Sequence, residues 1–227
     1  MNQSAYRGPH PGVLAVIFMV LFIVGLSFVI SFTSPVHFPH PSESSEVIAS
    51  YFQLQSRDVL MCAFFQFGSA IPLGILTAAF VSLLRLAGAN APGTYIALFG
   101  GFTTAISLVV SSSVIWVMAY PGIAQDSSII RMLYYIGFAV GGVGYSVPLG
   151  LLLAGIAVTS GFLKLMPKWM IVAGIALAVI GELSWFSMIA PGLLPLIPLT
   201  RFPGFIWLII AGFMLYNKLT ERKSAGA

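Results

Sequence analysis

One apolar run sets the class of this protein. Residues 169–190 read Trp169-Met-Ile-Val-Ala-Gly-Ile-Ala-Leu-Ala-Val-Ile-Gly-Glu-Leu-Ser-Trp-Phe-Ser-Met-Ile-Ala190, with one acidic residue, Glu182, inside the run. About 20 apolar residues let a helix cross a bilayer, so this run predicts a transmembrane helix. A charged side chain in hydrocarbon costs roughly 3 kcal/mol on insertion scales, so such a group usually faces a bundle interior, is paired or stays protonated. Glu182 is therefore the first candidate functional residue.

The composition is that of a membrane protein. Of the 227 residues, 59% are hydrophobic and 7% are charged, whereas soluble domains carry about 25% charged residues. The mean hydropathy is +1.01. The net charge of +4 is no indication of nucleic-acid binding, because Lys and Arg mainly mark the cytoplasmic side of a membrane protein. The single cysteine, Cys62, excludes an intrachain disulfide and a CxxC pair.

Six apolar stretches predict an all-α polytopic transmembrane bundle that forms a single integral-membrane domain over residues 1–227. The predicted spans are approximately 12–32, 59–84, 94–118, 129–158, 169–190 and 202–217. The first is longer than the roughly 7–15 apolar residues of a signal peptide and has no clear Ala-x-Ala site, so we expect a retained helix. The last is short, near the lower limit for crossing.

The longest polar connection, residues 33–57, contains two histidines, His37 and His40. Their spacing is compatible with a metal site, with only Glu43 and Glu46 as further ligands. The simpler interpretation is an extracytoplasmic loop, and we predict no metal and no cofactor.

The basic residues predict the orientation. With the N-terminus inside, seven of them are cytoplasmic: Arg7, Arg85, Lys164, Lys168, Lys218, Arg222 and Lys223. Three lie on the opposite side: Arg57, Arg131 and Arg201. The excess predicts both termini in the cytoplasm and an even number of spans, in a cytoplasmic (inner) membrane. Arg131 and Arg201 are most simply interpreted as anchors that extend to the headgroups.

Two predicted spans resemble each other. Gly68-Ser-Ala-Ile-Pro-Leu-Gly-Ile-Leu-Thr-Ala78 aligns without a gap to Gly144-Tyr-Ser-Val-Pro-Leu-Gly-Leu-Leu-Leu-Ala154. The similarity is compatible with a repeat of helical hairpins, as in some transporters. Chance similarity between apolar sequences of low complexity is the alternative.

Polar side chains at similar depths predict a layer around Glu182. At 1.5 Å per residue, Glu182 lies roughly 12 Å from the outer end of its helix. The candidate ligand-binding or proton-binding residues are Glu182, Gln66, Ser111, Ser113, Tyr134, Tyr135 and Tyr145. The layer is interpreted either as a site for a proton, a cation or the polar part of a ligand, or as hydrogen bonds that fix helix packing.

Small residues predict which faces pack. Gly174, Ala178 and Glu182 recur every four residues and share one helix face, and small residues mark close helix contacts in membranes. Matching small faces are Gly137, Gly141 and Tyr145 in the fourth span, and Gly100, Thr104, Ser107 and Ser111 in the third.

Sequence patterns of known catalytic sites are absent. No His lies within a predicted span, and no Walker, HExxH or GxSxG motif occurs. An enzyme would have to work with Glu182, Tyr or Ser alone, so we predict no catalytic residue and favour a protein that is not an enzyme.

The last third of the chain carries Gly161-Phe-Leu-Lys-Leu-Met-Pro-Lys-Trp-Met-Ile-Val-Ala-Gly174 and then Pro198-Leu-Thr-Arg-Phe-Pro-Gly-Phe-Ile-Trp207. This part resembles uncharacterised bacterial multi-pass inner-membrane proteins, in which a Pro-Lys/Arg-Trp turn opens the fifth helix and a Trp-bearing sixth helix closes the chain. The resemblance implies a bacterial inner-membrane location and no known activity.

The leading hypothesis is a membrane protein that handles a small solute, proton or cation around Glu182. The alternative is a non-transporting membrane component that packs against a partner protein or a second copy. In both cases the expected surroundings are the lipid bilayer, and nucleic acid is excluded as a partner.

Overall fold

The computed structural model describes residues 6–30, 38–120 and 122–224, and all regular elements in these ranges are helices. The α-helices are α1 (Pro11–Ser27), α2 (Ser45–Leu54), α3 (Ser56–Leu86), α4 (Pro92–Met118), α5 (Ser127–Gly141), α6 (Val143–Phe162), α7 (Lys168–Leu183) and α8 (Leu196–Ser224). Three short 3-10 helices are η1 (Ile123–Gln125), η2 (Ser184–Met188) and η3 (Pro191–Leu193).

Five helical segments are long and apolar enough to cross a membrane. They are Ser56–Leu86, Pro92–Met118, Ser127–Phe162, Lys168–Met188 and Pro191–Thr220. Helix α1 is apolar but has 17 residues, which is below the about 20 that a span commonly needs. The prediction of a helical membrane protein is therefore confirmed at this level, whereas the first predicted span, the total of six spans and the orientation of the termini stay predictions.

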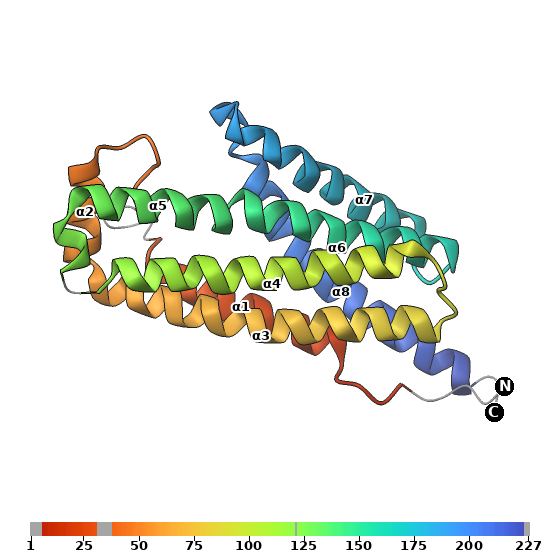
Figure 1. Ribbon diagram of the computed structural model, residues 1–227. Coiled ribbons are helices and arrows are strands. Elements are labelled where there is room, and N and C mark those ends of the chain that lie inside the picture. Colours follow the sequence, from red (N-terminus) through yellow and green to blue (C-terminus); the bar gives the residue numbers. More distant parts are fainter. Residues whose placement is uncertain (1–5, 31–37, 121, 225–227) are drawn as a thin grey trace.

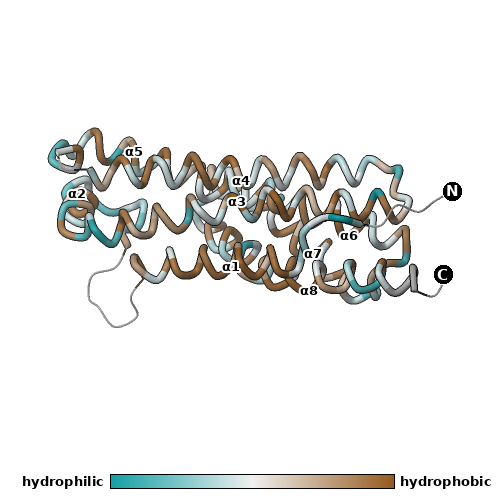
Figure 2. Tube along the Cα trace, turned by 90° about the horizontal axis from the view of Figure 1, so that it is seen from below, coloured by the Kyte–Doolittle hydropathy of each residue, from teal (hydrophilic) through white to brown (hydrophobic). Residues whose placement is uncertain are grey.

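The long helices lie side by side in an elongated bundle (Figure 1). One end carries α2 and is called the α2 end. The other, called the terminal end, carries the turn between α6 and α7 and the last turns of α8, where Tyr6 packs edge-on against Tyr216. Polar residues concentrate at both ends, with the apolar residues between them (Figure 2). This pattern is the one expected of a bundle whose middle lies in hydrocarbon.

Local sequence signals explain where several helices begin. The side chains of His10 and Asp126 accept hydrogen bonds from first-turn N–H groups of α1 and α5. Pro92 occupies the first turn of α4, where its missing N–H costs nothing. These caps fix the ends of helices whose length is otherwise set by the apolar runs.

The predicted extracytoplasmic loop contains a helix that the sequence analysis missed. Helix α2 begins after Ser44, whose hydroxyl accepts a hydrogen bond from Val47 N. It buries Ile48 and Phe52 completely. Only ten residues long, α2 has too little apolar sequence to resemble a span, and this is why a polar connection was expected.

The predicted fourth span is two helices separated by a break. Gly142 has φ −89° and ψ −94°, outside the helical region, so α5 ends at Gly141 and α6 begins at Val143. Pro148 has no N–H for the carbonyl of Gly144, and the Ser107 hydroxyl donates to that oxygen instead at 2.7 Å. Helix α4 thus stabilises the interrupted helix beside it.

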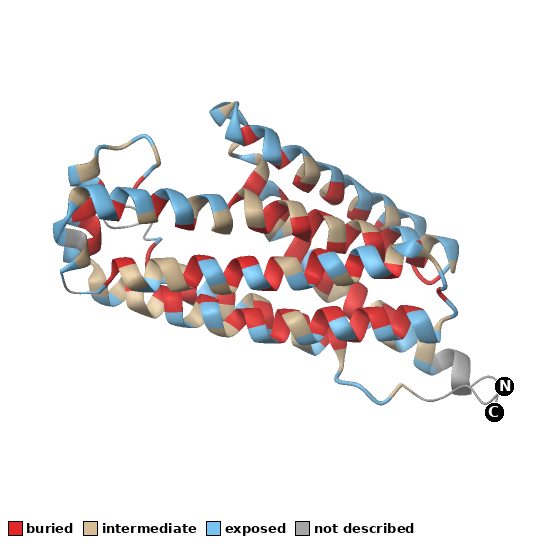
Figure 3. Ribbon diagram, in the orientation of Figure 1, coloured by how far each residue is buried: buried red, intermediate tan, exposed pale blue. Residues whose placement is uncertain are grey.

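Two buried clusters form the core. The larger occupies the middle and terminal end and includes Phe18, Leu149 and Phe205. The smaller lies at the α2 end, where α2 packs on α5 and includes Phe52 and Tyr134. Helix α7 presents mostly exposed residues to its outer side (Figure 3), so its packing partners are restricted to α6 and α8.

The predicted small-residue faces do pack. A Cβ on Gly174 would lie 2.5 Å from the Trp207 ring, and Ala178 is 3% exposed. A Cβ on Gly141 would lie within 3.1 Å of Ser111 Cβ. The small faces on the third, fourth and fifth predicted spans are therefore helix contacts, as expected.

Candidate functional site

A cavity of about 710 Å³ lies toward the α2 end, between the two core clusters. Its walls come from α1, α3, α4, α5, the segment 38–41, the η3 segment and the start of α8. Its polar side chains are His40, Gln66, Ser111, Tyr134 and Arg201, beside the thiol of Cys62. Arg201 is the charged residue among them, and no Asp or Glu occurs among the described residues that line the cavity.

Arg201 is held against the helix break. Its Nη2 group donates a hydrogen bond to the carbonyl of Gly141, the last residue of α5. Its guanidinium carbon lies 4.5 Å from the centroid of the Tyr145 ring and 5.5 Å from that of Phe22. These are cation–π distances. Two aromatic faces and one carbonyl therefore fix the guanidinium in place, without a carboxylate.

The arginine has hydrogen-bonding capacity left over. A guanidinium carries five N–H donors, and the acceptor described for Arg201 is the Gly141 carbonyl. The Nε atom is buried without a hydrogen-bond partner, and so is the Tyr145 hydroxyl beside it. Buried donors without acceptors are costly, so this arrangement favours an added anionic acceptor.

The interpretation of Arg201 as a headgroup anchor is wrong for this structure. Helix α8 begins at Leu196, so Arg201 lies more than one turn inside the helix and faces the bundle. The predicted sixth span begins at residue 202 and therefore leaves this arginine outside the membrane segment. Extending the span back through the apolar residues Leu196, Ile197 and Leu199 would have placed Arg201 inside it.

The side-chain amide of Gln66 also lacks a hydrogen-bond partner among the described residues. Gln66 is 8% exposed and lines the cavity. Its Cγ lies 3.2 Å from the position of a Cβ on Gly25, one turn of α1 beyond Phe22, which contacts Arg201. Gln66 and Arg201 therefore approach neighbouring turns of the same helix.

The other polar groups of the cavity serve the protein itself. The Ser111 hydroxyl donates to the Gly137 carbonyl at 3.1 Å. The Tyr134 hydroxyl donates to the carbonyl of Pro39 at 2.5 Å. These two predicted site residues thus lie at the cavity but use their protons within its walls.

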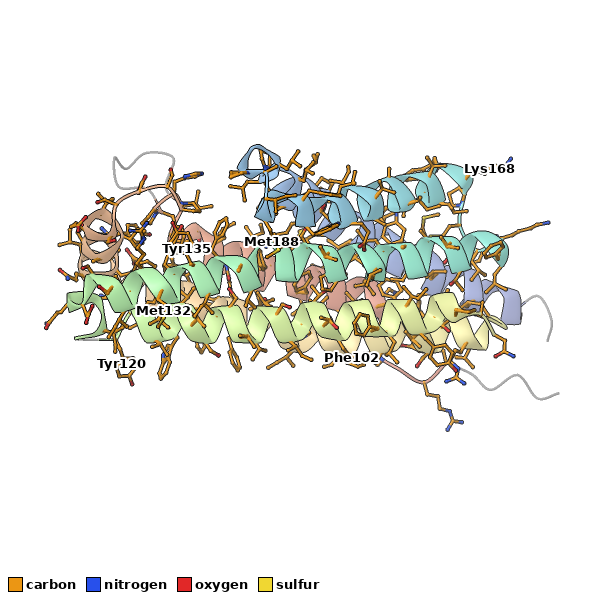
Figure 4. The ribbon with its side chains drawn as sticks, turned by 45° about the horizontal axis from the view of Figure 1, so that its top comes forward. Phe102, Tyr120, Met132, Tyr135, Lys168 and Met188 are labelled. Atoms are coloured by element: carbon orange, nitrogen blue, oxygen red, sulfur yellow. The ribbon has the colours of Figure 1, made fainter. Side chains whose placement is uncertain are left out.

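The segment 38–45 closes the α2 end and is called the strap. Tyr134 and Tyr135 both donate to its backbone, Tyr135 at 2.6 Å to Pro41, and Tyr135 lies between α5 and the strap in Figure 4. Arg131 Nη1 donates to Ser45 at 3.1 Å.

In the first turn of α2, hydrogen bonds from the Glu46 backbone N–H and from Ser44 lower the pKa of the Glu46 carboxyl. Burial raises the pKa of Tyr51 to about 12 on the same helix.

Glu182 does not line this cavity. Its Oε1 lies 3.1 Å from the position of a Cβ on Gly150 and is buried without a hydrogen-bond partner. Buried hydroxyls without partners also occur at Ser146 and Ser187. Glu182 therefore lies at the contact between α6 and α7.

The seven predicted site residues thus lie in four places. Gln66, Ser111 and Tyr134 line the cavity, and Tyr145 contacts it through Arg201. Tyr135 binds the strap. Ser113 lines a separate groove of about 860 Å³ beside Trp116, while Glu182 lies against α6. A layer at one depth is present in part, but it does not converge on Glu182.

The candidate metal pair is not assembled in the described part of the chain. His37 lies outside the described residues. His40 is exposed, and its Nδ1 lies 2.8 Å from the Ser42 hydroxyl. Among the described residues no group of three or more His, Cys, Asp or Glu is placed to hold a metal ion.

Comparison with known proteins returned no relative. No protein-family model matches the chain, and no curated protein or solved structure matches it either. The resemblance of the last third to bacterial inner-membrane proteins therefore stays a prediction.

Proposed function

We propose that this chain is an integral membrane protein that binds the anionic group of a small molecule at Arg201. The observation that carries the proposal is a part-buried guanidinium on the wall of a cavity whose described lining residues include no carboxylate. An ionisable residue inside a membrane segment is a functional candidate by default. The membrane setting is supported by five helices that are long and apolar enough to cross a membrane.

The sign of the ligand follows from electrostatics. An unpaired charge removed from water costs several kcal/mol, and an opposite charge with good hydrogen-bond geometry offsets that cost. Gly141 and Gly142 also line the cavity, so the beginning of α6 lies next to Arg201. The N-terminal end of α6 carries a partial positive charge, but the partly negative end of α5 lies beside it at Gly141, so the preference for an anion rests on the guanidinium.

A carboxylate or phosphate has more acceptor positions than one guanidinium edge uses. The Gln66 amide offers two further N–H donors and makes no hydrogen bond within the described part of the chain. We assign it to the same anion. By the predicted orientation the cavity faces the extracytoplasmic side of a cytoplasmic membrane, so the proposed solute arrives from that side.

Glu182 supports a second candidate function. Its buried Oε1 has no partner, and the unpartnered hydroxyls of Ser146 and Ser187 are also buried. A proton or cation at this acid remains the proposal that the sequence suggested. We favour the anion site because a cavity large enough for a small molecule adjoins Arg201.

The test uses three probes of equal size and different charge: benzoate, benzyl alcohol and benzylammonium. Cys62 lines the cavity and is the single cysteine of the chain. We expect benzoate to slow the alkylation of Cys62 by N-ethylmaleimide in neutral phosphatidylcholine nanodiscs. Benzylammonium should have no effect at the same concentration, because it would place a second cation beside Arg201. Equal protection by all three probes would reject an anion site.

Glu182→Gln separates the two candidate functions. Gln keeps the size of the side chain and cannot ionise. We expect this variant to keep its thermal stability in detergent within about 1 kcal/mol and to retain protection of Cys62 by benzoate. If benzoate protection disappears while the fold persists, the acid contributes to ligand binding and the favoured assignment is wrong.

A further inference from the structure

We infer that the ligand is an amphipathic anion, an oxyanion head on a long apolar chain, which enters from the lipid leaflet at the α2 end. This inference rests on the proposed anion site and adds the class of ligand and its route. It comes from the apolar walls of the cavity, its rim and the strap that covers it.

The walls of the cavity are suited to an acyl chain. Apart from the few polar side chains already named, they are aliphatic, aromatic or glycine surfaces. The large apolar lining residues include Leu26, Val29, Leu108, Ile115, Met118 and Phe138. A small hydrophilic anion would leave this surface in contact with water. An acyl chain would cover it and so remove the cost of exposing apolar walls to water.

The exposed residues that line the cavity are called its rim, and they are apolar apart from His40. Ile30 is one of them and is 41% exposed. Pro191, Pro195 and Pro198 are others and are called the proline rim. Proline has no backbone N–H, so these positions present no unsatisfied donor to lipid, where such a donor is costly.

The neighbouring η2–η3 connection has the surface of a lipid-embedded segment. Met188 and Ile189 are 72% and 80% exposed. Helix α7 and η2 end well short of the α2 end, beside the long α5–α6 pair (Figures 1 and 4). Exposed side chains of this kind belong in hydrocarbon or at its boundary. The proline rim therefore faces the leaflet rather than bulk water.

The strap favours lateral entry for a long-chain amphiphile, whereas small water-soluble probes are expected to reach the cavity past it. Pro39 is buried, and the carbonyls of Pro39 and Pro41 accept hydrogen bonds from Tyr134 and Tyr135. These bonds hold the strap across the α2 end of the cavity, whose lining includes Phe38, His40 and Pro41. We expect an amphiphile to enter past Ile30 and the proline rim and to reach Arg201 without displacing the strap.

The experiment is photolabelling with a long-chain fatty acid that carries a diazirine in mid-chain. The protein is placed in nanodiscs of neutral phosphatidylcholine, irradiated and mapped by peptide mass spectrometry. We expect label on the peptides that contain Ile115, Met118 or Phe138. The fatty alcohol with the same chain and diazirine should label these peptides less, because it lacks the charge that Arg201 binds.

Two matched variants test the route. Ile30→Trp places a bulky ring on the rim and should abolish labelling of the cavity peptides. Ile23→Trp, at a residue of equal 41% exposure on α1 that does not line the cavity, should leave it intact. Labelling that ignores both changes, or label restricted to lipid-facing residues such as Val172 and Val179, would overturn the inference. If benzoate still protects Cys62 in that case, the anion site stands and only the ligand class and route are rejected.

Discussion

Gly100→Ala is expected to destabilise the protein by about 3 kcal/mol or more, the upper range for overpacking a tight contact. A Cβ at this position would lie 2.5 Å from Leu152 N and 2.6 Å from Pro148 O. Both are backbone atoms of α6, which cannot rotate away as a side chain can. The two helices would have to separate at a contact on which the whole bundle depends.

The matched control is Gly68→Ala on α3. A Cβ there meets nothing within 4 Å, and alanine favours helix over glycine by about 1 kcal/mol. This variant should be neutral or slightly more stable. Thermal unfolding in detergent, followed by circular dichroism, measures both. Equal loss in the two variants would mean that α4 and α6 do not meet at Gly100.

The contact matters for the site as well as for stability. Helix α6 carries Tyr145, against which the Arg201 guanidinium packs, and α4 carries Ser107, whose hydroxyl satisfies the Gly144 carbonyl near the break. A shift of α6 away from α4 therefore changes the surroundings of Arg201. We expect Gly100→Ala protein that remains folded to lose charge selectivity at Cys62.

The long apolar helices and the small-residue contacts between them could be predicted from the sequence. Apolar length predicts the helices, and the spacing of Gly174 and Ala178 predicts a buried face because one helix turn brings them into line. The break at Gly142 could not be predicted from the sequence, because glycine and proline are common in membrane helices and most of them cause no interruption. The repeat of Gly68–Ala78 in Gly144–Ala154 stays a prediction.

Only part of the site could be predicted from the sequence, and the reason is geometric. The rise per residue gives the depth of a side chain, and Gln66, Ser111 and Tyr134 were correctly grouped on that basis. Depth does not say which helices are neighbours. Helix α7 packs on α6 and α8, so Glu182 meets Gly150 rather than the cavity.

The second large effect concerns charge selection by Arg201. Cys62 reports it, because this single cysteine lines the same cavity. Two unit charges that are about 10 Å apart interact by roughly 1.7 kcal/mol at an effective dielectric of about 20, which corresponds to more than about tenfold in rate. An anionic methanethiosulfonate should therefore modify Cys62 faster than a cationic one, after correction for their rates with a free thiol.

Arg201→Gln should remove this preference while keeping hydrogen-bond donors beside Gly141. Arg131→Gln is the matched control, because Arg131 is exposed at the same end, bonds to Ser45 and does not line the cavity. In Arg131→Gln, the preference of Cys62 for the anionic reagent should stay close to that of the unchanged protein. The reagents are membrane-impermeant, so adding them from one side at a time also tests the predicted orientation.

The ratio of anionic to cationic modification rates at Cys62 is the most direct measurement of the central claim. The account predicts a corrected ratio of about ten or more, a ratio near one in Arg201→Gln, and no such loss in Arg131→Gln. A ratio at or below one in the unchanged protein, or a ratio that Arg201→Gln leaves as it was, would contradict an anion-binding cavity at Arg201.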